Sequence, residues 1–403
     1  MYKVPTCHAL LLFVACVVSG CGDSDRKPRS APSIKRAPIR VVELSSTGMV
    51  AAARSGGDYL VRMQQEDGSF HYLYDAATDR VIEDAEYNIL RHAGTAFSLF
   101  DLYAHTKDAR YLAAANRAID FLKTRFRPVT ESNFLYVLDF DGKAKLGASG
   151  LALLAISRQI ELDPASAHHD VALQLANHIL ALQEPDGAFL SYHPISGDEP
   201  ERDSLYYPGE AMFGLLEYYR LRTNEVRLLE AARRGADYLI EDQRAMPELP
   251  PDAWLMQALE VLHKIKPNPK YVEHTIALAE AILRDQYTSE ATPERYMGDK
   301  NIGGFGPGEP RSTPAAARSE GILSAYRMAR AQNDQRAATF LAALKASAKF
   351  QLAHQFTKED AGWLPNADKA AGAFQGSFST TRVRIDYVQH NISSLLGLAQ
   401  VWE

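Results

Sequence analysis

The chain carries the sequence Gln64-Gln65-Glu66-Asp67-Gly68-Ser69-Phe70, and a close copy returns as Gln183-Glu184-Pro185-Asp186-Gly187-Ala188-Phe189. Both copies follow a stretch with the hydrophobic spacing of an amphipathic helix, so the shared pattern Q-x-x-D-G-x-F marks a helix end. Asp-Gly favours a tight turn, because glycine tolerates a positive φ. We expect the aromatic residue to fold back beneath the helices. The stretches that look like degenerate copies are Gly303-Gly304-Phe305, Gly362-Trp363 and Gln375-Gly376-Ser377-Phe378.

Outward from these turns, helical patterns of two kinds alternate. Residues 108–125 place Leu112, Ala115 and Ile119 on one stripe, with charged residues elsewhere. Residues 147–160 are apolar nearly all round, and such a helix must be buried on every side. We expect buried helices to begin near Arg91, Gly147, Pro208, Asp252, Arg318 and Val388, and amphipathic helices near residues 46, 108, 166, 225, 269 and 335.

Strict alternation of buried and half-exposed helices predicts an inner and an outer ring. The predicted fold is therefore all-α, a single (α/α)6 toroid over residues 44–403. A solenoid of tetratricopeptide or HEAT repeats is the alternative, but its repeats would be shorter and more regular. Strand signals are weak, and only residues 71–74 and 133–140 predict short hairpins within loops.

The paired helices and the Gln/Gly/aromatic turns resemble the α/α toroids: terpene cyclases, prenyltransferase β-subunits and six-hairpin carbohydrate enzymes. The resemblance covers most of the chain but is generic, since the turns are structural. A terpene cyclase would show a D-x-D-D-like cluster and a protein prenyltransferase a zinc-binding cysteine, and we find neither. The resemblance therefore implies a fold shared with glycosidases, polysaccharide lyases and uronyl epimerases.

The N-terminus resembles that of a bacterial lipoprotein. Lys3 precedes an apolar stretch, residues 9–18, that is too short to span a bilayer. It ends in Val18-Ser19-Gly20-Cys21, which looks like a lipobox. We expect residues 1–20 to be a signal peptide, Cys21 to be lipidated, and residues 21–43 to form a flexible tether.

The residue after the lipidated cysteine is Gly22 and not Asp, which for such proteins favours the outer membrane, facing the periplasm. A plain secretory signal is the alternative. Cys7 and Cys16 would be removed with the signal peptide, leaving no cysteine for a disulfide, a zinc site or a nucleophile. The expected partners are thus a membrane, through the lipid on Cys21, and a glycan substrate. Whether the chain also has protein partners is unknown from the sequence.

Composition excludes several classes of protein. The chain has 403 residues, 46% hydrophobic and 23% charged, which is globular composition. The formal charge of −6 argues against nucleic-acid binding, which needs a clustered basic surface. No later stretch reads as a transmembrane helix.

Familiar catalytic and metal motifs are also missing from the sequence. It has no H-E-x-x-H, no G-x-S-x-G, no Gly-rich phosphate loop after a strand and no EF-hand pattern. His168-His169-Asp170 lacks a distant third metal ligand. We expect no metal and no cofactor.

Polar side chains gather at the predicted starts of the buried helices, which should meet at one mouth of the ring. Acidic residues there have a simple explanation in helix capping, above all Asp252, but cations do not. A cation at a helix N-terminus either pairs with a neighbouring carboxylate or binds an anionic ligand. The predicted substrate-binding residues are Glu86, Tyr87, Arg91, His92, Lys145, Tyr206, Tyr207, Asp252, Trp254, Arg318 and Arg384.

The predicted catalytic residues are Glu210, Glu320, Asp386 and His390. Two carboxylates across a cleft, one of raised pKa, are what glycoside cleavage needs. Asp386 and His390 are four residues apart on one helix face, where they would orient one another.

These residues predict a cell-envelope carbohydrate-active enzyme, in the first place a glycoside hydrolase acting on a uronate-containing glycan, because Arg and Lys favour an acidic sugar. One alternative is a uronyl lyase or C5-epimerase, with Tyr207 or His390 as the base. Another is a glycan-binding or envelope-assembly lipoprotein without turnover.

Overall fold

A computed structural model describes residues 43–402, apart from residues 130–131, 195–200, 291 and 297. The predicted signal peptide, the lipidated Cys21 and almost all of the tether lie outside the described residues. No described helix is both long and apolar enough to cross a membrane.

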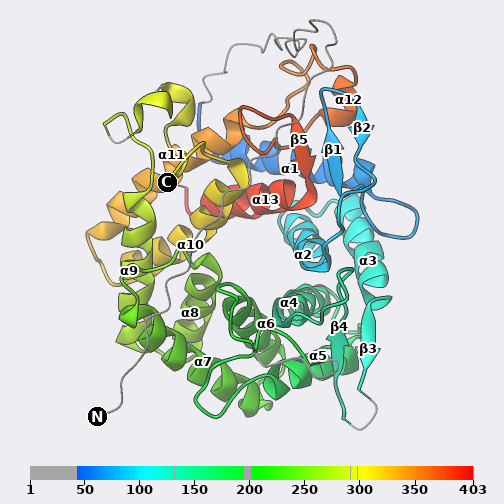
Figure 1. Cartoon of the computed structure of the whole chain (residues 1–403), viewed down its shortest axis with the longest axis vertical. Helices are drawn as coiled ribbons and strands as arrows, with labels where there is room; N and C mark the ends of the chain where they lie inside the picture. Colours follow the sequence, from blue (N-terminus) through cyan, green and yellow to red (C-terminus); the bar gives the residue numbers. More distant parts are fainter. Residues whose placement is uncertain (1–42, 130–131, 195–200, 291, 297, 403) are drawn as a thin grey trace, which may run out of the picture. The chain divides into compact units, whose positions relative to one another are not determined.

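The inner ring consists of six helices, each in contact with the next and the last with the first (Figure 1). In chain order they are α2 (Ile89–Thr106), α4 (Leu146–Leu162), α6 (Tyr207–Leu221), α8 (Ala253–Ile265), α10 (Ser312–Ala331) and α13 (Ile385–Gln400). Most of their residues are buried, as their all-round apolar sequences require.

The outer helices pack behind this ring: α1 (Ser46–Met63), α3 (Ala109–Lys123), α5 (His169–Ala181), α7 (Val226–Ala245), α9 (Pro269–Arg284) and α11 (Arg336–Ala353). Their apolar stripes face the inner helices. Side chains cap the starts of α1, α3 and α9; Asp108 before α3, for example, accepts a hydrogen bond from the Arg110 N–H. α1 packs mainly on α13, which closes the ring. The predicted (α/α)6 toroid is therefore confirmed.

One predicted start was wrong. α10 begins at Ser312 and not near Arg318, because Pro314 lies in the first turn, where a missing N–H costs nothing. Arg318 and Glu320 therefore lie inside the helix and not at its start. α13 begins at Ile385, slightly before the predicted Val388.

The connections that lead into the inner helices are mostly long and carry the remaining elements. β1 (Leu73–Asp75) pairs antiparallel with β2 (Arg80–Val81) and with β5 (Arg382–Arg384), and β3 (Phe126–Pro128) pairs antiparallel with β4 (Leu135–Val137). In register, Tyr74 lies opposite both Val81 and Val383. The two hairpins were predicted, and β5 was not.

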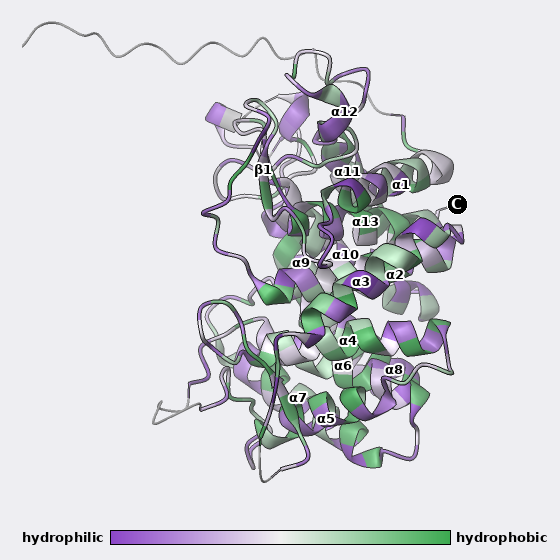
Figure 2. Ribbon diagram, turned by 90° about the vertical axis from the view of Figure 1, so that its right-hand side faces the viewer, coloured by the Kyte–Doolittle hydropathy of each residue, from purple (hydrophilic) through white to green (hydrophobic). Residues whose placement is uncertain are grey.

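The other short elements are the helix α12 (Ala367–Ala370) and the 3-10 turns η1 (Glu294–Tyr296) and η2 (Asp299–Asn301). Connections that leave the inner helices are short, such as residues 107–108 and 266–268. Figure 2 shows β1 and the long connections on one face of the ring. The inner helices therefore direct their N-termini to the face where loops can build a site.

The glutamine turns join neighbouring outer helices. The Gln64 Nε2 donates to the carbonyl of Gly68 in its own turn (3.1 Å) and to that of Ala114 in α3 (2.8 Å). Gly68 has a φ of +89° and lies against the Arg117 carbonyl, where a Cβ would be only 2.1 Å away. Only glycine fits there.

The same turn recurs at Gln183, Gln286 and Gln355, which pair with Phe189, Phe305 and Phe374. The predicted copy at 303–305 is thus confirmed. The copies at 362–363 and 375–378 were wrong, because the fourth turn runs from Gln355 through Gly372 to Phe374. A long insertion separates glutamine from aromatic there, which hides the pattern in the sequence.

Candidate active site

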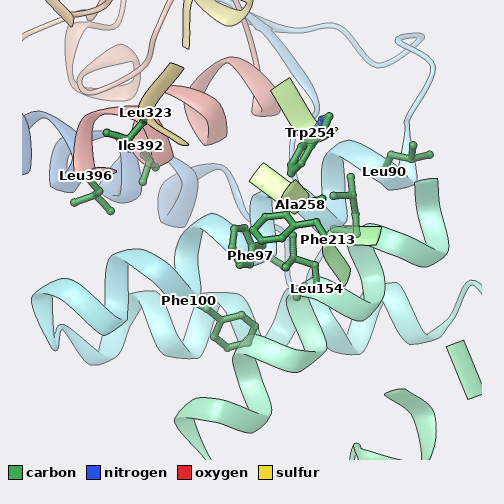
Figure 3. Close-up of a cluster of buried hydrophobic side chains, with 14 of the residues drawn as sticks. Leu90, Phe97, Phe100, Leu154, Phe213, Trp254, Ala258, Leu323, Ile392 and Leu396 are labelled. Atoms are coloured by element: carbon green, nitrogen blue, oxygen red, sulfur yellow. The ribbon is translucent and has the colours of Figure 1, made fainter. Parts of the chain in front are cut away.

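A layer of aromatic rings crosses the interior of the inner ring. Phe97 of α2 meets Phe213 of α6 with ring centroids 6.4 Å apart, and Phe213 meets Trp254 of α8 at 6.3 Å (Figure 3). The ring of His390 follows at 6.0 Å from Trp254. This layer places the imidazole of α13 beside an apolar surface, where charge interactions are stronger than in water.

His390 is paired with Glu320 of α10. The His390 Nδ1 lies 3.0 Å from the Glu320 Oε1, and both side chains are almost buried. Burial alone would lower the pKa of His390, but the Glu320 carboxylate raises the pKa above its usual value. When Nδ1–H donates to the carboxylate, Nε2 is left to accept a proton. The predicted partner of His390 was Asp386, and the structure shows Glu320 in that place.

Glu210 of α6 is a buried carboxyl group without a counter-charge in contact. Its Oε2 has no hydrogen-bond partner among the described residues. It lies against Gly147 of α4, where a Cβ would be 2.0 Å from Oε2. The pKa of Glu210 is raised to about 8, chiefly by burial and also by the charge of Asp252, while His390 and Arg91 act in the opposite direction. Glu210 is therefore protonated at neutral pH and able to donate a proton.

Asp386 is held by two arginines and is not free to act as an acid or a base. The Arg384 guanidinium donates to both of its oxygens, at 2.6 and 2.9 Å. The Arg91 Nε lies 3.3 Å from the Asp386 Oδ2, and Arg91 also donates to the Tyr72 hydroxyl at 2.7 Å. The sequence analysis did not single out Tyr72, although it lies in the predicted hairpin. Asp386 and Tyr72 together hold Arg91 at the edge of the mouth.

Lys145, a predicted binding residue, has a structural role beside the mouth of the ring. The Lys145 Nζ lies 2.6 Å from the Asp139 Oδ2 and is also paired with Asp141. Asp139 in turn accepts a hydrogen bond from the N–H of Ile89, the first residue of α2 (2.9 Å). Lys145 therefore fixes the start of a neighbouring inner helix.

His92 is fully buried and accepts no ligand in this arrangement. Its Nδ1 lies 2.8 Å from the Tyr87 hydroxyl and its Nε2 2.8 Å from the Ala118 carbonyl. Burial lowers the pKa of His92 to about 4, so the imidazole is neutral. Tyr87 is packed among aromatic rings, and Glu86 is exposed in the loop before α2. We leave these three residues out of the site.

Asp252 caps the start of α8, as the helix-capping explanation of this residue predicted. It accepts a hydrogen bond from the Leu255 N–H at 3.0 Å and from the Gln243 Nε2 at 3.0 Å. Burial raises the pKa of Asp252 to about 7, although these hydrogen bonds lower it. Its charge acts on Glu210, so it belongs to the surroundings of the site.

Tyrosines and one arginine complete the mouth. Tyr207, the first residue of α6, packs edge-on against Tyr192, and Tyr206 is 43% exposed. Arg318 is half-buried and donates to the Gly306 carbonyl at 3.2 Å. In the described part of the chain, no group of three or more His, Cys, Asp or Glu side chains is placed to hold a metal ion.

Comparison with known proteins finds similar proteins by structure alone. No family model matches the sequence, and no curated protein matches it. A D-mannose isomerase superposes with a TM-score of 0.64 at 15% identity, covering 93% of this chain and all of that one. A cellobiose 2-epimerase from Bacillus thermoamylovorans gives 0.65 at 15% identity, covering 88% of this chain and all of that one.

Glycoside hydrolases share the same architecture. A family 76 α-mannanase from Bacteroides thetaiotaomicron gives a TM-score of 0.63 at 8% identity, covering 89% of this chain and 96% of that one. An inactive variant of the Salegentibacter α-1,6-mannanase, with two consecutive aspartates replaced, has been solved with α-1,6-mannotriose. This sequence contains no two consecutive aspartates. The likeness extends over nearly the whole described chain, which therefore has the (α/α)6 toroid fold of the six-hairpin glycosidases.

Proposed function

We propose that the chain is a carbohydrate-active enzyme that transfers protons at a sugar. In this proposal His390 is the base, Glu320 orients it, and Glu210 is the acid. The observation that carries the proposal is the contrast between two neighbouring groups: a His390–Glu320 pair ready to accept a proton, and a Glu210 that holds one. The isomerase and the epimerase among its structural neighbours support sugar chemistry on this fold.

This proposal reverses the order of the sequence-based hypotheses. A hydrolase needs a second carboxylate free to activate water or attack the sugar. Glu320 is engaged with His390, and Asp386 is engaged with two arginines. Proton abstraction, as in an isomerase, epimerase or lyase, uses the groups as they are placed. Hydrolysis is the second candidate, and the raised pKa of Glu210 favours it, because a general acid of a glycosidase needs that property.

The experiment is incubation of the full-length protein in D2O with neutral and acidic sugars and envelope glycans, followed by NMR. Deuterium at a sugar carbon, or an unsaturated sugar, supports proton abstraction. New reducing ends without deuterium support hydrolysis. Binding without any product supports the glycan-binding alternative and contradicts the proposal.

Matched variants assign the roles. His390→Asn and Glu210→Gln should each lower kcat by at least about a hundredfold, the usual contribution of a general acid or base. Glu217→Gln makes the same change further along the same helix, where Glu217 is paired with Arg220 and is not among the groups that shift the pKa of Glu210 or His390, so this variant should keep its activity. Equal losses in all three would indicate damage to the fold.

We also propose the cell envelope as its location, with a lipid on Cys21 and the toroid facing the periplasm. The lipobox-like Val18-Ser19-Gly20-Cys21 supports this proposal. Membrane fractionation tests it: wild-type protein should sediment with the outer membrane, and Cys21→Ala should not. A wild-type protein in the soluble fraction would contradict it.

A further inference from the structure

The cations of the mouth differ in what neutralises them. Arg91 and Arg384 share the carboxylate of Asp386, and Lys145 is held between two aspartates. Ion pairs within the protein therefore already neutralise these three positive charges. Arg311 is exposed and donates to the Tyr387 hydroxyl, so water solvates most of its guanidinium.

Arg318 is different, because it is half-buried and has no carboxylate at ion-pair distance among the described residues. One nitrogen donates to the Gly306 carbonyl, and the guanidinium lies 5.3 Å from the centroid of the Phe305 ring. The nearest acidic group that acts on it is the exposed Asp285, which is not in contact. A guanidinium has five N–H donors, so most of its hydrogen-bonding capacity is unused.

A desolvated cation without a counter-ion is costly, and most buried charges in proteins are paired. Arg318 therefore lacks an anionic partner within the protein, and a bound ligand could supply one. The planar guanidinium fits a carboxylate in a two-point contact better than it fits a neutral hydroxyl group.

Tyr206 lies beside this position. The connection into α8, residues 246–252, is the shortest that enters an inner helix, which leaves the space above α8 open between α6 and α10. The proximity of Tyr206 and Arg318 is visible in their electrostatics, since Arg318 lowers and Asp252 and Glu210 raise the pKa of the phenol, which burial raises most.

We propose that Arg318 binds the carboxylate of an acidic sugar unit at the α8 side of the mouth. This inference rests on the proposed function and narrows its substrate to uronate-containing saccharides. It also assigns the acidic preference to one residue, whereas Arg91, Arg384 and Lys145 keep structural roles.

Binding without turnover tests the subsite. Full-length protein carrying Glu210→Gln is titrated by calorimetry with glucuronate-, galacturonate- and mannuronate-containing tetrasaccharides and with their carboxyl-reduced counterparts. At least one acidic tetrasaccharide should bind about ten- to a hundredfold more tightly than its reduced form, as expected for a charge-assisted hydrogen-bonding pair. Arg318→Met should abolish that difference and leave the affinity for the reduced form unchanged, and Arg318→Lys should restore part of it.

Arg311→Met is the matched control, since it removes a cation from the start of the same helix. It should keep the discrimination, and an equal loss would assign the effect to general electrostatics and overturn the role of Arg318. If acidic and reduced saccharides bind equally, the subsite fails and the proposed function stands. If neither binds, both fail. A melting temperature within a few degrees of wild type confirms that each variant is folded.

Discussion

At the scale of single residues, the site depends on two groups whose surroundings shift their pKa values upward for different reasons. Burial raises the pKa of Glu210 to about 8, whereas the carboxylate of Glu320 raises that of His390 against the effect of burial. His390 must be neutral to accept a proton, and Glu210 must be protonated to donate one. Activity is therefore expected only between the two pKa values.

We expect kcat/KM to follow a bell-shaped pH profile. The acidic limb should lie above pH 6.5, where His390 loses its proton, and the basic limb near pH 8, where Glu210 loses its own. Glu320→Gln removes the charge that raises the pKa of His390, so its acidic limb should move to lower pH by about one unit. The basic limb should stay in place. A Glu320→Gln profile that coincides with that of wild type would contradict the assignment.

The same carboxyl group makes stability depend on pH. The pKa of Glu210 is near the ordinary value of 4.5 in the unfolded chain and about 8 in the folded protein. Between these values the unfolded state has released its proton and the folded state has not, so its contribution to the free energy of unfolding falls as pH rises. Below pH 4.5 both states are protonated, and the penalty disappears.

Glu210→Gln cannot titrate, so it should gain stability relative to wild type as pH rises from about 5 to 9. The relative gain should reach about 2–4 kcal/mol, from the usual 1.4 kcal/mol per pKa unit reduced for relaxation of the site. Urea unfolding at several pH values measures it. A difference between variant and wild type that is constant from pH 5 to 9 would show that Glu210 titrates normally.

At the scale of elements, the glutamine turns hold the outer ring together. The Gln183 Nε2 donates to the carbonyls of Gly187 (3.0 Å) and Ala231 (2.8 Å), and Arg234 donates to its Oε1 at 2.5 Å. One side chain thus connects the end of α5 to α7. These contacts lie in the outer ring and include none of the proposed proton-transfer groups. They should therefore affect stability and not catalysis.

Gln183→Ala should lower the free energy of unfolding by about 1–3 kcal/mol, because it leaves polar partners unsatisfied. Gly187→Ala should cost at least as much, since φ is +100° and a Cβ would lie 2.6 Å from the Arg234 carbonyl. Gln332→Ala, at an exposed position after α10, is the control and should change stability by less than about 0.5 kcal/mol. Denaturant unfolding compares the free energies of unfolding of the three variants. A Gln183→Ala value equal to that of the control would show that the glutamine turn does not stabilise the fold.

These elements also show what the sequence could predict. Helix positions followed from hydrophobic periodicity, which is local, and all twelve long helices of the described chain lie at or near the predicted places. β5 could not be predicted, because it pairs with β1 across most of the chain. The His390–Glu320 pair was missed for the same reason, since the sequence suggests neighbours four residues apart and the fold brings together two different helices.

At the scale of the whole ring, the two mouths differ. The N-terminal ends of the inner helices meet the long loops and the proton-transfer groups, and their partial positive charges favour an anionic ligand there. The opposite mouth contains a cavity of about 590 Å³, whose wall includes the ion pair of Asp101 and Arg158. Phe97, Phe213 and Trp254 of the aromatic layer line this cavity, and so does Glu320, whereas Glu210 and His390 are not part of its lining. The cavity therefore reaches Glu320 of the proposed site from the opposite side of the ring.

The ring closes where its first and last parts meet. Gly56 of α1 packs on α13, where a Cβ would lie 3.2 Å from Ile392 and 3.3 Å from Val388. The Gln355 Nε2 donates to the Ala52 carbonyl at 2.9 Å and adds a second link across the same seam. Because every inner helix contacts two neighbours, opening this seam exposes apolar surface on both the first and the last hairpin.

Gly56→Leu should therefore destabilise the ring as one unit. Its side chain overfills the seam, which should lower the free energy of unfolding by about 1–3 kcal/mol or more. Calorimetry should show a single transition in wild type, and the variant should shift that transition to lower temperature without splitting it. Ala51→Leu adds the same side chain on the exposed face of α1 and should leave the transition in place. A separate early transition in Gly56→Leu would mean that the first hairpin unfolds alone, and that closure of the ring contributes little to its cooperativity.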